Sequence, residues 1–297
     1  MTPLIRKDLS ALSTAIPYIK AFKGKTFVVK MGGDLCESER AIHDIIEQIT
    51  LLQQLGINVV LVHGGGKHST KLAESLGIKT EFVNGRRITS SVALEVLKMS
   101  FLGTLNTNIL LTARKIGLSA VGLSGIDADL IVAHRRGPVS VKTDQGTETV
   151  DFGHVGEIDS VNTTLLKNLI SDGLVPVIAS LGATREGEAL NINADTIAAY
   201  IAVALGAEKL IYTTTVDGVF DDINNPATLH SVLTQKEIES MRSKGLISEG
   251  MLPKLETALW ALERGVNRVH IVSGFSEDSI LHEAFTNEGA GTMITKE

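Results

Sequence analysis

The sequence has very little of what secreted or membrane-embedded proteins need. Cys36 is the only cysteine among 297 residues, so an intrachain disulfide is impossible and a reducing compartment is expected. No stretch approaches the roughly 20 continuous apolar residues of a transmembrane helix. The N-terminal residues 1–22 carry charges too often for the apolar core of a signal peptide. We therefore expect a cytoplasmic protein.

Runs of positive charge are also absent. Lys and Arg total 28 against 34 Asp and Glu, which gives a formal net charge of −6 at pH 7. Nucleic acids and anionic membranes attract proteins mainly through clustered basic residues, so we expect neither as a partner. The length is sufficient for a large core in one or two domains.

Several common motifs of catalysis and nucleotide binding are missing. A Walker A loop needs glycine where Leu61 stands and Ser or Thr where His68 stands. The dinucleotide fingerprint G-x-G-x-x-G needs a third glycine where Ser69 stands. The HExxH and G-x-S-x-G patterns do not occur, and no metal-ligating residue follows His63 at a suitable spacing. We predict no metal site, a structural role for His63 and an unreactive Cys36 thiol.

Two apolar segments end in glycines and lead towards predicted helices. The glycine turns are Gly32-Gly33, after a predicted strand at 26–31, and Gly64-Gly65-Gly66, after a predicted strand at 58–62. Exposed backbone N–H groups at the start of a helix bind anions. Since parallel strands end at the same edge of a sheet, the two turns predict a crevice for phosphate or carboxylate. The residues alone fit plain turns between strand and helix equally well.

Predicted strands alternate with predicted helices along most of the chain. Helices are expected at 39–55, 69–76, 91–102, 105–116, 162–171, 196–205, 234–243 and 252–264, and further strands at 121–124, 175–179, 209–214, 268–272 and 292–294. This alternation indicates an α/β fold, a three-layer αβα sandwich around a mostly parallel open sheet. Residues 129–160 differ, because their short strands and turn signals are typical of inserted antiparallel hairpins.

We divide the chain into three parts. Residues 1–24 contain a helical pattern at 4–22, interrupted by Pro17, which fits an oligomer contact as well as packing on its own domain. Residues 25–182 form a predicted N-terminal lobe that contains the inserted hairpins. Residues 183–297 form a predicted C-terminal lobe, since a polar, glycine-containing connection occupies 182–187.

Two lysines stand where a bound anion would explain them. Lys30 lies near the end of an apolar strand, just before Gly32, and a buried ammonium group needs an anion. Lys254 follows Pro253 in the first turn of a predicted helix, where a cation opposes the helix dipole by ~0.3–1 kcal/mol. A nucleotide phosphate would compensate both charges, and simple exposure to water is the alternative for each.

Polar side chains precede the most apolar predicted helix. Asn191, Asn193 and Asp195 stand two residues apart, so in an extended segment they would face one ligand. One of them would suffice as a helix N-cap, and a cap followed by a turn is the alternative. Arg86 and Arg87 follow a predicted turn, and guanidinium groups bind carboxylates in bidentate geometry. One arginine is therefore predicted to hold an acidic substrate, and the spacing does not say which.

With these residues assembled, the chain resembles the amino-acid kinase family, and within it the acetylglutamate kinases. The matching segments are AIPYIKAFKGKTFVVKMGG (15–33), VHGGG (62–66), NGRRIT (84–89), GTLN (103–106), AVGLSG (120–125), NINAD (191–195), GMLPKLETAL (250–259) and EAFTNEGAGTMI (283–294). The resemblance implies transfer of the γ-phosphoryl group of ATP, carried with Mg²⁺, to the side-chain carboxylate of N-acetyl-L-glutamate in arginine biosynthesis. It also implies that the N-terminal lobe binds acetylglutamate and dimerises, and that the C-terminal lobe binds ATP.

The resemblance assigns roles position by position. Lys30 and Lys254 would stabilise the transferring phosphoryl group, and Asp195 would orient both lysines. The implied acetylglutamate contacts are Gly65, Gly66, Arg87 on the α-carboxylate, Asn191, and Asn193, which lies between the motif positions. The implied nucleotide contacts are Lys30, Gly32, Gly33, Thr214, Gly218 and Lys254. An acceptor carboxylate is already ionised at pH 7, so catalysis would depend on positioning and charge neutralisation rather than on a general base.

The N-terminal helix resembles the extension of arginine-inhibited, hexameric members of the family. His270, Glu283 and Gly289 match the positions that line their arginine site. The resemblance therefore implies a homo-oligomer, either a dimer or a hexamer built as a trimer of dimers, with arginine as an inhibitor. It also suggests a PII-type regulator as a further partner.

The chain departs from the family pattern at several positions. Met31, Lys67, His68, Thr215 and Phe275 stand where an aromatic residue, Pro, Gln, Asp and Arg are usual. These departures bear on nucleotide-side details and on the choice of acceptor. Three other functions stay open: a kinase for N-acetyl-aminoadipate or its carrier-bound form, a non-catalytic arginine-sensing copy of the fold, and a Rossmann dehydrogenase. The retained lysines and Asp195 argue against the non-catalytic copy. The missing third glycine and ribose-binding acid disfavour the dehydrogenase.

Overall fold

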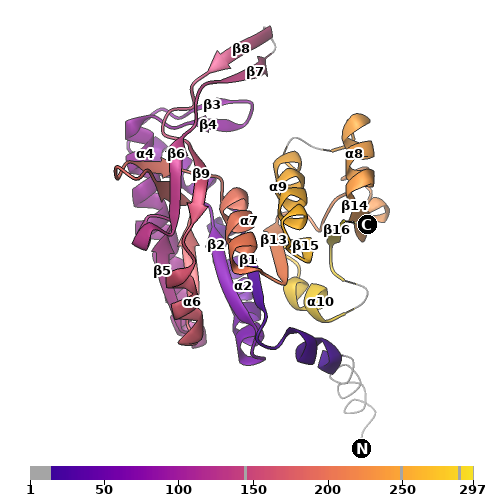
Figure 1. The fold of residues 1–297 in the computed structure, drawn as a ribbon. Coiled ribbons are helices and arrows are strands. Elements are labelled where there is room, and N and C mark those ends of the chain that lie inside the picture. The colour runs from indigo at the N-terminus through magenta and orange to yellow at the C-terminus, as the bar shows by residue number, and fades with distance from the viewer. Residues whose placement is uncertain (1–14, 144–145, 248–249, 287–288, 297) are drawn as a thin grey trace, which may run out of the picture.

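A twisted eight-stranded sheet forms the centre of the computed structural model, which describes residues 15–143, 146–247, 250–286 and 289–296 (Figure 1). In spatial order its strands are β14 (Val232–Thr234), β16 (Thr292–Thr295), β15 (Arg268–Ser273), β13 (Lys209–Thr214), β1 (Thr26–Met31), β2 (Asn58–His63), β10 (Val175–Ala179) and β5 (Ala120–Ser124). Every neighbouring pair is parallel except β15 with β16. The mostly parallel sheet predicted from the sequence is confirmed.

Helices cover both faces of this sheet, as the three-layer prediction requires. One face packs against α2 (Glu39–Gln54), α4 (Ser91–Lys98), α5 (Thr107–Ile116) and α10 (Ser279–Phe285), and the other against α6 (Thr164–Ser171), α7 (Ala194–Leu205), α8 (Gln235–Ser243) and α9 (Leu252–Glu263). The period of two along β1 sends Phe27 and Val29 to the α2 side and Val28 to the α7 side. Lys30 therefore belongs to the α7 side.

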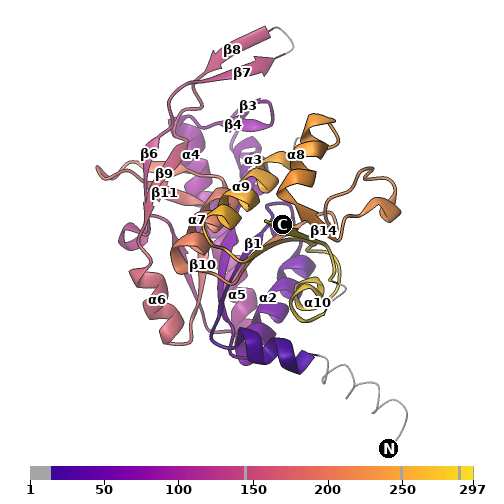
Figure 2. The same cartoon turned by 45° about the vertical axis from the view of Figure 1, so that its right-hand side comes forward.

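Smaller, mostly antiparallel groups of strands stand on the carboxyl-end side of the sheet (Figure 2). They are the hairpin of β3 (Glu81–Val83) and β4 (Arg86–Ile88), the hairpin of β7 (Val139–Thr143) and β8 (Gly146–Val150), and a four-stranded sheet of β12 (Ala189–Asn191), β11 (Leu181–Ala183), β6 (Ile131–Arg135) and β9 (Gly156–Val161). The hairpins predicted within 129–160 are confirmed. The predicted lobe boundary after residue 182 falls within the β11–β12 hairpin.

One predicted break in a helix is wrong. The sequence suggested separate helices at 91–102 and 105–116, whereas α4 continues into α5 through a π-helical segment, η2 (Met99–Asn106). The residues around Gly103 change the hydrogen-bonding pattern of the helix without interrupting it. The fourth residue of the GTLN segment, Asn106, thereby stays inside the molecule.

The described part of the predicted N-terminal helix is helical over residues 15–22, and residues 4–14 of that prediction lie outside the described residues. Phe22 packs edge-on against Phe27 of β1, with ring centroids 5.3 Å apart. Elsewhere, Trp260 of α9 stacks on Tyr200 of α7 at 4.2 Å, which ties these two helices together. Among the described helices, none combines the length and apolar character that a membrane crossing would require.

Candidate active site

Lys30, Asp195 and Lys254 form one ion-pair cluster near the carboxyl end of β1, which we call the two-lysine cluster. Lys30 Nζ lies 2.7 Å from Asp195 Oδ1, and Lys254 Nζ lies 3.1 Å from Asp195 Oδ2. Asp195 is the second residue of α7 and Lys254 the third residue of α9. The fold thus brings together three side chains that come from three separate elements and are widely spaced in the sequence.

In the two-lysine cluster, two cations share one carboxylate. The side chains of Lys30 and Asp195 are almost fully buried, whereas that of Lys254 is 20% exposed. Burial alone would raise the pKa of the Asp195 carboxyl, but the attraction of both lysines and the hydrogen bond from Lys254 outweigh it and hold that pKa below its usual value. With Asp195 ionised and two ammonium groups facing it, the cluster has one excess positive charge. It is open at Lys254, so it can accept an anion.

The two glycine turns lie against each other just beyond Lys30. Gly33 approaches the second turn so closely that a Cβ on it would lie 3.3 Å from the backbone nitrogens of both Gly65 and Gly66. A Cβ on Gly32 would lie 2.9 Å from the carbonyl oxygen of Thr213. The helix α3 (Gly66–Ser75) starts at the second turn. Two backbone amides at a helix N-terminus therefore face the turn after β1, an arrangement suited to phosphate or carboxylate.

Arg87 reaches from the β3–β4 hairpin to the first turn of α3. Its Nη2 donates hydrogen bonds to Gly66 O at 2.8 Å, to Thr70 Oγ1 at 2.7 Å and to Ser69 Oγ at 3.2 Å. Arg86, next to it, is exposed. The structure thus separates the two arginines, which their spacing alone could not, and places Arg87 beside the Gly64-Gly65-Gly66 turn.

The polar residues of 191–195 have three different partners. Asn191 Nδ2 donates to Thr89 Oγ1 at 3.2 Å, next to the β3–β4 hairpin. Asn193 is exposed and caps α7, because its Oδ1 accepts a hydrogen bond from Asp195 N at 2.7 Å. Asp195 belongs to the two-lysine cluster. Asn193 therefore has the capping role that was the alternative, and its contact with a ligand stays a prediction.

The loop after β13 is held against β16. Thr214 is the last residue of β13, and a Cβ on Gly218 would collide with Thr292 Oγ1. That same oxygen accepts a hydrogen bond from Val219 N at 2.8 Å and donates one to His230 O at 2.6 Å. Thr292 could not be singled out beforehand, since a threonine in a short closing strand has no local signal. The assigned nucleotide loop thus owes its shape to a residue near the other end of the C-terminal lobe.

His270, Glu283 and Gly289 also lie together, in a second buried cluster that we call the His270 cluster. His270 Nδ1 donates to Glu283 Oε1 at 2.6 Å, and Ala290 N donates to Glu283 Oε2 at 2.8 Å. Gly289 has φ +68°, and a Cβ on it would lie 2.8 Å from Glu283 Oε2. The three positions that the resemblance assigned to an arginine site are therefore neighbours.

Lys209 belongs to the His270 cluster and was missed in the sequence. Its Nζ lies 3.2 Å from His270 Nε2 and 5.2 Å from the centroid of the Phe22 ring. Burial lowers the pKa of Lys209 to about 8 and that of His270 to about 4. At pH 7 the ring is therefore neutral and the ammonium group still charged. The signal available in the sequence was a lysine at the start of an apolar strand, just as Lys30 stands near the end of one.

His63 and Cys36 are both buried and hydrogen-bonded inside the molecule. His63 is fully buried, with Nδ1 3.0 Å from Gly64 O and Nε2 3.1 Å from Asn106 Nδ2, and burial lowers its pKa to about 4. The Cys36 thiol is buried, with Sγ 3.5 Å from Gly32 O and 3.7 Å from Gly64 O. Burial raises the pKa of Cys36 to about 12, so the reactive thiolate does not form near neutral pH.

The positions that depart from the family pattern have different surroundings. Lys67 Nζ forms an ion pair with Asp34 Oδ2 at 2.8 Å, and His68 Nδ1 lies 2.8 Å from Ser100 Oγ. Met31 is fully buried, whereas Thr215 and Phe275 are exposed. Lys67 and Asp34 therefore link the two glycine turns by an ion pair.

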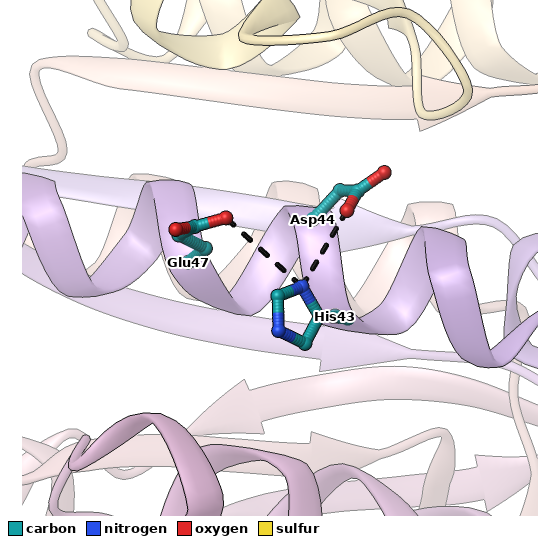
Figure 3. Close-up of side chains that lie close together, drawn as sticks. All are labelled: His43, Asp44 and Glu47. Atoms are coloured by element: carbon teal, nitrogen blue, oxygen red, sulfur yellow. Dashed lines mark ion pairs between the residues drawn. The ribbon is translucent and has the colours of Figure 1, made fainter.

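A further group of possible metal ligands lies on the outer surface of α2 (Figure 3). His43 Nδ1 is 3.5 Å from Asp44 Oδ1 and 4.0 Å from Glu47 Oε2. His43 and Glu47 are more than half exposed, and Arg40 already pairs with Asp44 at 3.5 Å. All three ligands come from one helix and a cation competes for one of them, so we assign no metal site here.

The chain is similar to known kinases over nearly its whole length. The model of the amino acid kinase family matches residues 25–273. An acetylglutamate kinase from Methanocaldococcus jannaschii is 47% identical over 287 residues, which cover 96% of this chain and 95% of the relative. An acetylglutamate kinase from Halothermothrix orenii is 42% identical over 297 residues, and the match covers 100% of both chains.

Solved structures share the fold. The N-acetylglutamate synthase of Neisseria gonorrhoeae, complexed with coenzyme A and N-acetyl-glutamate, superposes with a TM-score of 0.82 at 30% identity. This match covers 97% of our chain but 63% of the synthase, so the chain spans less than two thirds of that protein. The family match, the near full-length relatives and the common fold together show that this chain is a kinase and belongs to the amino-acid kinase family.

Proposed function

We propose that this chain transfers the γ-phosphoryl group of ATP to the side-chain carboxylate of N-acetyl-L-glutamate, giving N-acetyl-L-glutamyl 5-phosphate. The observation that carries the proposal is the two-lysine cluster beside the two abutting glycine turns. Both reacting groups are anions that repel each other, and this edge of the sheet offers the positive charge that can hold them together. The acetylglutamate kinases that align over nearly the whole chain support this choice of acceptor.

The chemistry needs no group that accepts a proton. The acceptor carboxylate is ionised at pH 7 and attacks the γ-phosphorus in line with the leaving β–γ bridging oxygen. Lys30 and Lys254 neutralise charge on the transferring group, while Asp195 fixes the two ammonium groups at 2.7 and 3.1 Å. Because these charges are already in place before the reaction, little reorganisation is required when the transition state forms.

The acceptor is proposed to lie at the Gly64-Gly65-Gly66 turn in the N-terminal lobe, residues 25–182. The amides of Gly65 and Gly66 would bind the reacting carboxylate, and Arg87 the α-carboxylate, with Asn191 nearby. Arg87 contacts α3 through Nη2, and its Nε and Nη1 carry the other donors of the guanidinium fork. A carboxylate can bind Nε or Nη1 through a single hydrogen bond while these contacts to α3 persist. A bidentate carboxylate would have to share Nη2 with them, because both bidentate edges of a guanidinium include Nη2.

The nucleotide is proposed to enter from the C-terminal lobe, residues 183–297, as MgATP. Gly32 and Gly33 would approach its phosphates, and the loop from Thr214 to Gly218 would contact the nucleotide. The tight packing of Gly218 against Thr292 supports a loop of fixed shape. Mg²⁺ would be carried by the nucleotide.

A hydroxylamine trapping assay tests this function, because hydroxylamine displaces phosphate from an acyl phosphate and gives a hydroxamate, which forms a coloured complex with added iron(III). Product should form only when ATP and N-acetyl-L-glutamate are both present. The kcat/KM for N-acetyl-aminoadipate, measured in parallel, should be much lower, and a higher value would assign the chain to that acceptor. A lack of product with every acceptor, together with retained arginine binding, would favour the non-catalytic copy of the fold.

Arginine inhibition and a hexamer are proposed from the His270 cluster. A carboxylate, an ammonium group and a histidine lie together there, and the ammonium group of Lys209 faces the ring of Phe22 in the N-terminal helix. A zwitterionic ligand and the helix would therefore meet at this cluster. We expect millimolar arginine to inhibit the wild type and not Glu283→Gln, and gel filtration to give a hexamer. A dimer that arginine does not inhibit would contradict both proposals. A PII-type regulator and the cytoplasmic location stay predictions.

A further inference from the structure

We propose that His63 and Asn106 are positioning residues for the acceptor. A chain of hydrogen bonds runs from the π-helical segment η2 through the His63 ring to the Gly64 carbonyl and fixes the direction of the Gly65 amide. The inference rests on the proposed function for the identity of the ligand. It goes beyond that function because it assigns a role to two buried residues that are not proposed to contact either substrate.

The hydrogen-bonding partners determine where each proton lies in this series of hydrogen bonds. Asn106 Nδ2 lies 3.0 Å from Val177 O, and because a carbonyl oxygen only accepts, the amide nitrogen must face it. The same NH₂ group lies 3.1 Å from His63 Nε2, so Nε2 accepts and carries no proton. The neutral ring then has its proton on Nδ1, which donates to Gly64 O at 3.0 Å. Two carbonyl groups at the ends thus determine the tautomer of the histidine between them.

The bond to Gly64 O determines where the next amide points. In a trans peptide the C=O of one residue and the N–H of the next point in opposite directions, and the described residues contain no cis peptide. His63 holds the Gly64 carbonyl towards the interior, where the Cys36 thiol also approaches it. The Gly65 N–H must therefore point away from the interior. The proximity of Gly65 N to Gly33 agrees with this direction.

The π-helical segment η2 packs directly against the Gly64-Gly65-Gly66 turn. A Cβ on Gly65 would collide with Leu105 and would lie 3.0 Å from Phe101, so η2 lies directly against the backbone of the turn. A Cβ on Gly122 of β5 would collide with Asn106 Oδ1, so that glycine makes room for the amide. A π turn holds one residue more than an α turn and re-aims the side chains that follow it. Asn106 ends this segment and points at His63.

A purely structural role for the same residues would have a different signature. Loss of buried hydrogen bonds alone would lower the melting temperature and the yield of active protein, and would leave the KM values of the surviving enzyme unchanged. A positioning role instead predicts a selective loss of affinity for the acceptor. A small displacement of a binding amide is enough to weaken a site considerably.

Three variants test the series of hydrogen bonds one bond at a time. Asn106→Ala removes the donor to His63. His63→Gln places an amide oxygen near the position of Nε2 and loses the donor to Gly64, whereas His63→Asn places an amide nitrogen near Nδ1 and keeps it. Thr50→Val on α2 is the matched control, because it removes another buried hydrogen bond, from Oγ1 to Ile46 O at 2.7 Å, far along the chain from the turn.

In the hydroxylamine assay we expect the KM for N-acetyl-L-glutamate to rise about tenfold or more in Asn106→Ala and His63→Gln, with the KM for ATP within about twofold of wild type. His63→Asn should lie between these variants and wild type, and Thr50→Val should keep both KM values. Equal rises for both substrates, or a lowered melting temperature with unchanged KM values, would overturn the inference.

A measurement independent of activity separates this inference from the proposed function. Nitrogen-15 NMR of the histidine rings should show His63 as the neutral Nδ1–H tautomer at pH 7, with that signal altered in Asn106→Ala. A proton on Nε2 would overturn the inference even in an active enzyme. If the wild type phosphorylates no acetylglutamate, the proposed function fails, and the tautomer still decides whether the hydrogen-bond chain exists.

Discussion

The two buried lysine–carboxylate clusters of this kinase lie on opposite faces of one sheet. The two-lysine cluster faces α7 and α9, where the fifth residue of β1, Lys30, meets Asp195. The His270 cluster faces α10, where the first residue of β13, Lys209, lies against His270 and Glu283. One cluster stands near the carboxyl ends of the strands and the other nearer their amino ends.

The clusters differ in their charge balance. The first has two ammonium groups for one carboxylate, whereas the second has one of each and a neutral histidine. A buried cluster with excess charge needs a counter-ion, whereas a balanced one needs none and suits a ligand that carries charges of both signs. The stoichiometry of buried charges, more than their mere presence, therefore distinguishes a site for anions from a neutral one.

Removal of the shared carboxylate should have the largest effect. Asp195→Asn leaves the buried ammonium group of Lys30 and the partly exposed one of Lys254 without their carboxylate. Breaking a buried pair such as Lys30–Asp195 typically costs about 3–5 kcal/mol of the free energy of unfolding. Glu283→Gln should cost less, because the pKa of Lys209 is already about 8 and this lysine can release its proton more readily. Urea denaturation of both variants at pH 7 measures the difference, and equal losses would remove the distinction between the clusters.

Removal of either cation of the first cluster should affect catalysis more than binding. We expect Lys254→Ala and Lys30→Ala to lower kcat by about 10²–10³, the usual effect of losing one preorganised donor to developing charge. Lys236→Ala, an exposed lysine on α8, is the control and should keep the wild-type kcat. A normal kcat in Lys254→Ala would reject the catalytic assignment.

Arg87 should contribute to acceptor binding. Loss of hydrogen bonds from a charged donor typically costs about 1.5–3 kcal/mol, so Arg87→Ala should raise the KM for the acceptor about 10- to 100-fold and change kcat little. Its exposed neighbour supplies the control, and Arg86→Ala should behave as wild type. Steady-state kinetics with the acceptor varied at saturating ATP would show the split, and a fall confined to kcat would contradict it.

Acid should weaken the fold through His270. Its pKa of about 4 in the folded chain lies below the ordinary value of 6.5, so between these values the unfolded chain binds the extra proton and stability falls as the pH falls. The loss from pH 6.5 to 5 should be on the order of 2 kcal/mol for this group. Chemical denaturation across this range should give a shallower slope for His270→Gln than for wild type and for the exposed control His43→Asn. Identical slopes would contradict the buried, neutral ring.

Most of the sheet could be predicted because its signals are local. Apolar β-branched runs ended by glycines, such as 58–66, identify strand and turn without knowledge of the rest of the chain. The break expected near Gly103 failed because a π turn keeps the helix continuous while its sequence resembles an interruption. Glycine and polar residues signal a turn in most contexts. That they belong to a helix here follows only from the packing of η2 against Gly65.

The site could be predicted only in part. Lys30, Lys254 and the glycine turns stood out by position, but their meeting at Asp195 depends on how α7 and α9 pack, which no spacing reveals. Arg87 could be separated from Arg86 only through its contacts with α3. Three further residues could not be identified from the sequence, because their hydrogen-bond partners lie far away in it: Lys209, Asn106 and Thr292.

The stacked pair of Trp260 and Tyr200 gives the molecule an optical probe of its own. Trp260 is the only tryptophan in the chain, so all tryptophan emission comes from α9. It lies six residues after Lys254, about 9 Å along the helix axis, and its aromatic partner stands on the helix of Asp195. A change in the packing of these two helices when a ligand binds would therefore alter the fluorescence of the unlabelled enzyme, and stopped-flow mixing could follow the event in real time.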